Sequence, residues 1–216
     1  MALPASDSFS QTTGGTQGIS TYSANWTVIG SGGMEVPSGA NRVEGTTGGY
    51  NTAYWNADTF SADHEASVAV TATWLSEGVY AGPAVRCQVG ADTSYHVDSN
   101  GSATYLSGDS AGTHPLSTDI SSDVGTLVAG DVIKLSAEGV GATVTLKVYT
   151  APAASPTTFT LKGTYTDTSG TRITTAGYAG VFIYGNSNGG PTNFKADNIG
   201  GGGGPTGSPW NYYAQQ

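Results

Sequence analysis

Apolar and polar residues alternate along much of this chain. In residues 66–75, which read ASVAVTATWL, every second residue from Ala66 to Trp74 is apolar and the residues between them are mostly polar. A period of two residues is typical of a β-strand with one buried face. The same pattern returns in three further segments: residues 133–137, 142–148 and 159–165. It predicts an all-β fold, an antiparallel β-sandwich of the jelly-roll kind, with little or no helix.

About a dozen segments can be marked as strands, enough for two packed sheets. They are residues 8–10, 25–29, 42–44, 52–55, 66–75, 84–89, 94–97, 103–106, 131–137, 143–149, 159–165, 179–184 and 193–199. Asn100 and Gly101 supply a tight hairpin turn, so residues 79–106 are predicted to form a three-stranded meander. Helical signals are confined to residues 117–128, where Gly125 would end a short turn.

Length and charge narrow the classes of protein. A chain of 216 residues fits one β-sandwich domain, which we place at residues 1–199. Only 11% of the residues are charged, and a formal net charge of -9 would repel a phosphate backbone. The seven Lys and Arg residues form no cluster along the sequence. No nucleic-acid partner is therefore predicted, and no membrane either, because no apolar run approaches the length of a membrane span.

The two ends of the chain carry separate signals. The first residues lack the basic and apolar regions of a signal peptide, and Met1 predicts synthesis in a cytoplasm without Sec-type export. A Gly- and Pro-rich linker at residues 200–209 leads to an aromatic tail at residues 210–216. The tail holds three aromatic residues: Trp210, Tyr212 and Tyr213. They either fold back on their own domain or, as the flexible linker favours, dock on a neighbouring subunit.

Five short blocks are spread over most of the chain: Asp7-Ser8-Phe9, YAGPAVRCQV (80–89), LVAGDVIKLSAEG (127–139), TDTSGTRITTAGYAGVFIYG (166–185) and NFKADNI (193–199). Together they resemble the concanavalin A-like lectin and glucanase superfamily, and within it the LamG-like jelly rolls of phage and bacterial surface proteins. The resemblance implies a sandwich whose first and last strands lie side by side. It also implies that a glycan, if bound, would lie on a concave face or at the rim of loops.

No motif predicts catalysis. A glucanase of that superfamily would carry a Glu-x-Asp-x-Glu strand, and none of the five glutamates is followed by Asp two positions on. The string GNSNG around Ser187 matches a nucleophile elbow, but no helix is predicted after it and no histidine lies beyond His114. His64 and Glu65 begin a zinc-protease string that lacks its second histidine. We therefore predict no catalytic residues and no enzyme activity.

Aromatic residues are the candidates for ligand contact. Trp26, Trp74, Phe159 and Phe182 lie in the apolar phase of predicted strands, so we assign them to the core. The others lie near strand ends or loops, where their rings could stack on the C–H faces of sugars. These candidate ligand-binding residues are Tyr54, Trp55, Tyr80, Tyr95 and Tyr105.

A structural calcium ion is the one cofactor that the sequence leaves open. If the terminal strands pair, Asp7 and Asp197 become neighbours and Asn198 adds a carbonyl oxygen, which suits a hard cation. The chain lacks a D-x-D-x-D loop, however, and aspartates in turns usually accept hydrogen bonds from main-chain amides.

Three functional hypotheses follow. The first is a non-catalytic, oligomeric component of a virion or particle surface, such as a phage capsid-decoration or tail-associated protein, whose partners are other protein subunits. The alternative is a glycan-binding, lectin-like module, extracellular and directed to a cell-surface glycan. The third hypothesis is a glycoside hydrolase. It is remote because the sequence shows no pair of carboxylates that could catalyse hydrolysis.

Overall fold

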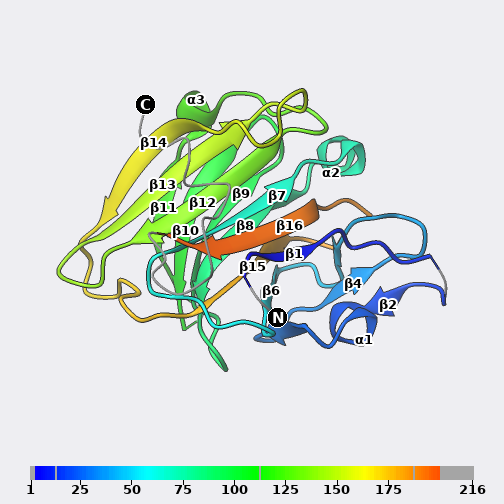
Figure 1. Ribbon diagram of the computed structural model, residues 1–216, viewed down its shortest axis with the longest axis horizontal. Helices are drawn as coiled ribbons and strands as arrows, with labels where there is room; N and C mark the ends of the chain where they lie inside the picture. The colour runs from blue at the N-terminus through cyan, green and yellow to red at the C-terminus, as the bar shows by residue number, and fades with distance from the viewer. Residues whose placement is uncertain (1–2, 13, 112, 187, 200–216) are drawn as a thin grey trace.

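Antiparallel pairing builds two large sheets that stack face to face (Figure 1). The structure, a computed structural model, describes residues 3–12, 14–111, 113–186 and 188–199. Within these residues the first sheet has six strands, in the order β1-β16-β7-β12-β13-β14. Their bounds are Ala5–Asp7 (β1), Thr192–Asn198 (β16), His64–Ala69 (β7), Val132–Glu138 (β12), Val144–Ala151 (β13) and Thr160–Asp167 (β14).

The second sheet has seven strands in the described part of the chain, in the order β11-β10-β9-β8-β15-β6-β3. Their bounds are Thr113–Asp119 (β11), Thr104–Ser110 (β10), Ser94–Ser99 (β9), Tyr80–Cys87 (β8), Tyr178–Tyr184 (β15), Tyr50–Trp55 (β6) and Trp26–Ile29 (β3). Strands β8, β9 and β10 are consecutive neighbours, which confirms the predicted meander. Gly101 in its turn has a φ of 90°, a backbone conformation that favours glycine.

A small third sheet and three short helices complete the described residues. The sheet has the order β2-β4-β5, with bounds Gln17–Gly18, Met34–Val36 and Glu44–Gly45. The helices are α1 (Ile19–Tyr22), α2 (Ala72–Glu77) and α3 (Ser121–Val124). None of these helices is long or apolar enough to cross a membrane. The sixteen strands described confirm the all-β sandwich, and they exceed the dozen expected because short edge strands carry little pattern.

The predicted strand at residues 66–75 is too long. Strand β7 ends at Ala69, and residues 72–77 form helix α2 instead. Thr71 caps this helix because its Oγ1 accepts a hydrogen bond from the Trp74 amide at 3.0 Å, and Gly78 ends it with a φ of 65°. The indole of Trp74 is fully buried all the same. The predicted helical turn is confirmed as α3, which ends at Gly125.

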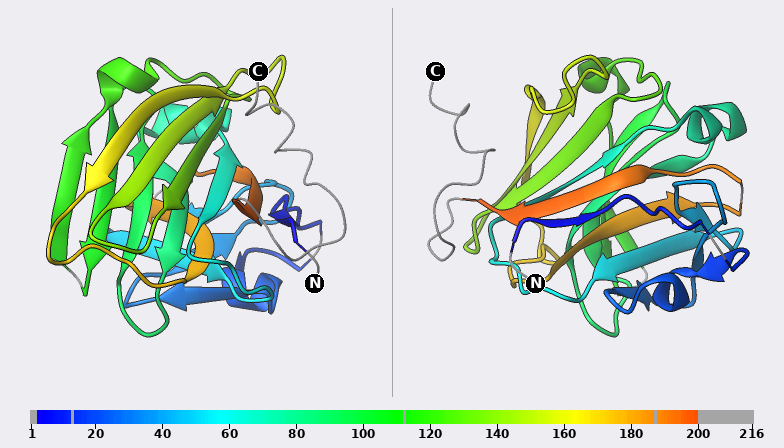
Figure 2. Two further views of the ribbon diagram at one scale, coloured as in Figure 1. Left: turned by 60° about the vertical axis from the view of Figure 1, so that its left-hand side comes forward. Right: turned by 45° about the vertical axis from the view of Figure 1, so that its right-hand side comes forward.

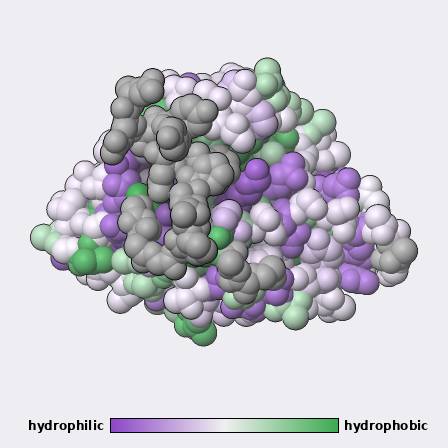
Figure 3. All heavy atoms as spheres, viewed as in Figure 1, coloured by the Kyte–Doolittle hydropathy of each residue, from purple (hydrophilic) through white to green (hydrophobic). Residues whose placement is uncertain are grey.

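The hydrophobic core lies between the two large sheets. Alternate residues of β7 and the segment after it, Ala66, Val68 and Val70, are buried as the pattern predicts. They share one cluster with inward-facing residues of both sheets. The surface agrees with this placement of the core. On the face turned to the viewer in Figure 3, the coloured atoms are mostly hydrophilic or neutral, and hydrophobic residues are scattered.

The first and last described strands pair side by side (Figure 2), as the resemblance implies. Asp7 on β1 lies opposite Phe194 on β16. The Oδ1 atom of Asp7 accepts a hydrogen bond from the Phe9 amide at 2.7 Å, and Phe9 takes a left-handed backbone with a φ of 52°. This turn directs the Phe9 ring onto Trp26, where Phe194 also packs.

Candidate functional site

A groove on the outer face of the seven-stranded sheet is the strongest candidate site. Its cavity has a volume of about 250 Å³. Six aromatic or histidine side chains line it, with three smaller polar residues between them: Tyr50, Tyr80, Tyr105, Tyr184, Phe182 and His96, with Asp98, Ser107 and Ser117. We call this feature the aromatic groove.

Strand pairing aligns the tyrosines of the aromatic groove. Tyr184, the last residue of β15, lies opposite Tyr50, the first of β6, and opposite Tyr80, the first of β8, so three antiparallel neighbours place a tyrosine at the same edge of the sheet. Side chains at paired positions point to the same face of a sheet. The rings of Tyr50 and Tyr184 meet edge to face at 5.2 Å, and those of Tyr80 and Tyr105 lie 5.9 Å apart. The groove therefore has a pair of tyrosines on each side.

The floor of the groove depends on small residues in β8. This strand lies between β9 and β15, and it carries Gly82 opposite Phe182 and Ala84 opposite His96. Because these two residues are small, the His96 and Phe182 rings reach across β8 and stack, with centroids 3.7 Å apart and planes at 12°. A Cβ atom on Gly82 would collide with the Val97 carbonyl oxygen. Larger residues here would fill the groove.

Tyr50 and Tyr184, which form one wall of the groove, are partly exposed to solvent. Tyr50 is 41% exposed and Tyr184 is 45% exposed, although both are large and partly apolar. A phenol is protonated at neutral pH, and burial raises the pKa of Tyr50 and of Tyr80 further. The groove thus offers apolar ring faces, phenolic donors and the oxygens of Asp98, Ser107 and Ser117. Such a surface suits a ligand with both C–H faces and hydroxyl groups.

Two of the predicted ligand-binding residues, Tyr80 and Tyr105, lie in the groove. The other three are buried, so their rings cannot receive a ligand, and the prediction is corrected for them. Trp55 packs edge to face on Trp26, with ring centroids 5.5 Å apart. The hydroxyl of Tyr95 donates a hydrogen bond of 2.6 Å to the Asp167 carboxylate inside the sandwich. Tyr54 is covered, and its ring lies 4.6 Å from that of Tyr178.

Sequence reasoning missed six groove residues: Tyr50, Tyr184, His96, Asp98, Ser107 and Ser117. It also placed Phe182 in the core. That ring is buried, but it forms the floor of the groove on the outer face rather than part of the core between the sheets. The alternation in β15 did contain a signal, because Phe182 and Tyr184 share one face and the apolar Val181 and Ile183 share the other.

The paired terminal strands do not bring Asp7 and Asp197 together. The register places Asp7 opposite Phe194, whereas Asp197 lies opposite Glu65 of β7. The Asp7 carboxylate instead accepts hydrogen bonds from the hydroxyl of Tyr22 and the indole of Trp26, each at 2.8 Å, besides the Phe9 amide. The predicted docking residues Trp210, Tyr212 and Tyr213 lie outside the residues that the structure describes, as does Ser187.

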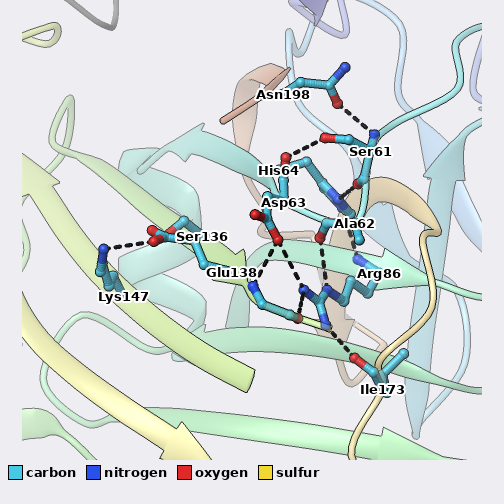
Figure 4. Close-up of polar contacts among 11 residues, drawn as sticks. Ser61, Ala62, Asp63, His64, Arg86, Ser136, Glu138, Lys147, Ile173 and Asn198 are labelled. Carbon is cyan, nitrogen blue, oxygen red and sulfur yellow. Dashed lines mark hydrogen bonds and ion pairs between the residues drawn. The ribbon is translucent and has the colours of Figure 1, made fainter. Parts of the chain in front are cut away.

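A second polar cluster, on the inner side of β8, holds that strand in place (Figure 4). Arg86 has a φ of 53° at a bulge in β8, and its amide donates to Nε2 of His64 at 3.0 Å. Its buried guanidinium donates hydrogen bonds to three main-chain carbonyl groups, those of Ala62, Gly139 and Ile173. His64, considered above as part of a protease string, is therefore a structural residue that anchors β8.

Burial of His64 predicts a loss of stability in acid. Desolvation lowers the pKa of His64 to about 4, whereas an unfolded histidine titrates near about 6.5. Because the unfolded chain takes up the proton first, the free energy of unfolding should fall as the pH drops from about 6.5 to about 4, by about 3 kcal/mol. Urea titrations across this range measure the effect. The His64→Gln variant should lose this part of the slope, and an unchanged slope would contradict the assignment.

Comparison with known proteins places the fold. No family model and no curated protein matches the sequence. A GH43 glycoside hydrolase structure is similar with a TM-score of 0.52 and 16% identity, over 92% of this chain and 41% of that chain. The carbohydrate-binding module CBM66 from Bacillus subtilis has a TM-score of 0.48 at 13% identity, over 81% of this chain and 92% of its own.

Lectin II from Ulex europaeus has a TM-score of 0.44 at 9% identity, over 90% of this chain and 98% of its own. This chain spans about two fifths of the GH43 structure. At these identities the likeness concerns the fold alone. The likeness to the GH43 structure agrees with the antiparallel β-sandwich fold that the strand pairing shows.

Proposed function

We propose that this protein is a non-catalytic glycan-binding protein that holds a sugar chain in the aromatic groove. One observation carries the proposal: strand pairing sets four tyrosines around a hollow of about 250 Å³, and the two on one wall are about half exposed. Asp98 is the one carboxylate in the lining, whereas glycoside hydrolysis ordinarily needs two.

The physics of sugar binding fits this lining. A pyranose ring has an apolar C–H face that packs on an aromatic ring and a rim of hydroxyl groups that needs hydrogen bonds. The tyrosines offer the first kind of contact, and Asp98, Ser107 and Ser117 offer the second. Because the phenols remain protonated, Tyr50 and Tyr80 can also donate to sugar oxygens.

The hypothesis of a virion-surface protein, with other subunits as partners, stays a prediction. Its docking residues lie outside the described part of the chain, and the groove favours the glycan-binding alternative. A particle protein that binds glycans would satisfy both hypotheses.

Affinity electrophoresis tests glycan binding. Native gels would contain a soluble glucan, mannan, xylan or galactan, and retardation of the protein would report binding. For a retained protein, Tyr50→Ala and Tyr184→Ala should each weaken the affinity by about tenfold, because an aromatic contact in a binding site is worth about 1–2 kcal/mol. Both side chains are about half exposed, so thermal stability should change little.

Leu161→Ala is the matched control, because Leu161 is 50% exposed but lies on β14 of the other sheet. Its retardation should equal that of the wild type. Binding that survives both tyrosine substitutions would place the ligand elsewhere, and binding lost equally in the Leu161 variant would point to a general effect on the fold.

A further inference from the structure

Most of the Lys and Arg residues lie on one of the two large sheets. Of the seven Lys and Arg residues, four lie on strands of the six-stranded sheet: Lys134, Lys147, Lys162 and Lys195. Arg86 alone lies on a strand of the seven-stranded sheet. Its guanidinium is fully buried on main-chain carbonyl groups and cannot face the groove. The described lining of the groove contains no Lys or Arg.

The aromatic groove, by contrast, has one carboxylate in its described lining and two more on the same sheet. Asp98 lines it from β9, where it lies opposite Tyr105 and accepts a hydrogen bond from Oγ of Ser107 at 3.3 Å. Asp109 on β10 and Asp119 on β11 belong to the same sheet. After burial itself, the charges near Tyr50, those of Asp109 and Asp98 among them, add to the rise of its pKa. His96, which lines the groove, pairs with Asp109 when it is protonated, with Nδ1 and Oδ2 3.7 Å apart, so Asp98 is the carboxylate that gives the described lining its negative charge.

We infer that the sugar chain held in the aromatic groove is uncharged or carries free amino groups, and that Asp98 makes the groove reject anionic glycans. The inference rests on the proposed function and adds the class of ligand and the residue that selects it. A uronate or sulfate group on a bound sugar would lie close to the Asp98 carboxylate with no Lys or Arg in the lining to compensate it. A protonated amino group at the same place would be attracted.

Three sets of polymers test the inference in the same native gels. The uncharged set is glucan, mannan, xylan and galactan, the amine-bearing set is chitosan and polygalactosamine, and the anionic set is polygalacturonate, alginate and hyaluronan. We expect the wild type to be retarded by a member of the first two sets and by none of the third. Retardation by an amine-bearing polymer should weaken as salt is added, because salt screens the attraction.

The Asp98→Asn variant separates charge from shape. It should gain retardation by anionic polymers and lose affinity for amine-bearing ones by roughly three- to tenfold, as removing one nearby charge predicts. Its affinity for uncharged polymers should change much less. Asp197→Asn, which makes the same charge change on the six-stranded sheet, is the control and should behave as the wild type.

The outcomes separate the inference from the proposed function. If the wild type binds anionic polymers as well as uncharged ones, or if Asp98→Asn leaves the ranking unchanged, the inference is wrong while glycan binding stands. If no polymer of any set is retained, glycan binding itself fails and the inference fails with it.

Discussion

Replacing Phe194 by alanine is expected to lower the free energy of unfolding by about 3–5 kcal/mol, the usual cost of removing a buried phenylalanine ring. The ring is fully buried and packs edge to face on Trp26, with centroids 4.8 Å apart. Phe9 is buried against the same indole at 5.4 Å, so Phe9→Ala should cost a similar amount. Denaturation in urea or guanidinium chloride measures both losses.

The two substitutions should not be additive, because both rings contact Trp26. A double-mutant cycle should give a coupling energy of about 0.5–3 kcal/mol. Phe159→Ala is the matched control, since that ring is only half-buried above the ammonium group of Lys134, and it should cost clearly less. If Phe9→Ala and Phe194→Ala prove harmless, the cluster does not fasten the terminal strands, contrary to the structure described above.

Replacing Arg86 by methionine is expected to cost about 3–5 kcal/mol of stability, even though methionine fills a similar volume. The guanidinium is the hydrogen-bond donor for the carbonyl groups of Ala62, Gly139 and Ile173. Without it the buried carbonyl of Ile173 and the partly buried carbonyls of Ala62 and Gly139 lose their donor, and breaking a buried charged network has costs of this order. Lysine cannot replace arginine here, because one ammonium group cannot reach three carbonyls that lie in different directions.

Arg172→Met is the control for this prediction. Arg172 also donates to main-chain carbonyl groups, those of Gly141 and Ser169, but these bonds are exposed to solvent. Water can replace them, so the cost should stay below about 1 kcal/mol. An equal loss of unfolding free energy in Arg86→Met and Arg172→Met would contradict the claim that burial makes the Arg86 hydrogen bonds important. Arg86 also helps to hold β8 in place. If Arg86→Met lowers stability but leaves the aromatic groove intact, the neighbouring strands alone are enough to position β8.

The fold could be predicted from the sequence because a half-buried strand has a period of two residues. Residues 131–137, predicted as a strand, appear as β12 at Val132–Glu138, and the meander appears with its turn at Asn100 and Gly101. The same rule failed at residues 70–75. There the apolar residues continue in strand phase, but Thr71 and Gly78 carry the signals that cap a helix.

The groove was harder to predict because its parts come from distant segments. Tyr50, Tyr80 and Tyr184 align only through the pairing of β6, β15 and β8, and a single sequence does not specify which strands pair. The alternation in β15 separates Phe182 and Tyr184 from Val181 and Ile183, but it does not show that a groove lies over Phe182. Trp55 and Tyr95 were wrongly assigned to the surface. The indole N–H of Trp55 and the hydroxyl of Tyr95 each donate a hydrogen bond to a buried carboxylate, so neither ring needs contact with solvent.

Binding of a sugar chain in the aromatic groove is tested most directly by an NMR titration. The ¹⁵N-labelled protein would be titrated with oligosaccharides prepared from the polymer that retains it most strongly. We expect the largest amide shifts at Tyr50, Tyr80, Tyr105 and Tyr184, with strands β13 and β14 of the opposite sheet unaffected. Saturable shifts that map to the six-stranded sheet instead, or no shifts at any of the four tyrosines, would contradict a binding site in this groove.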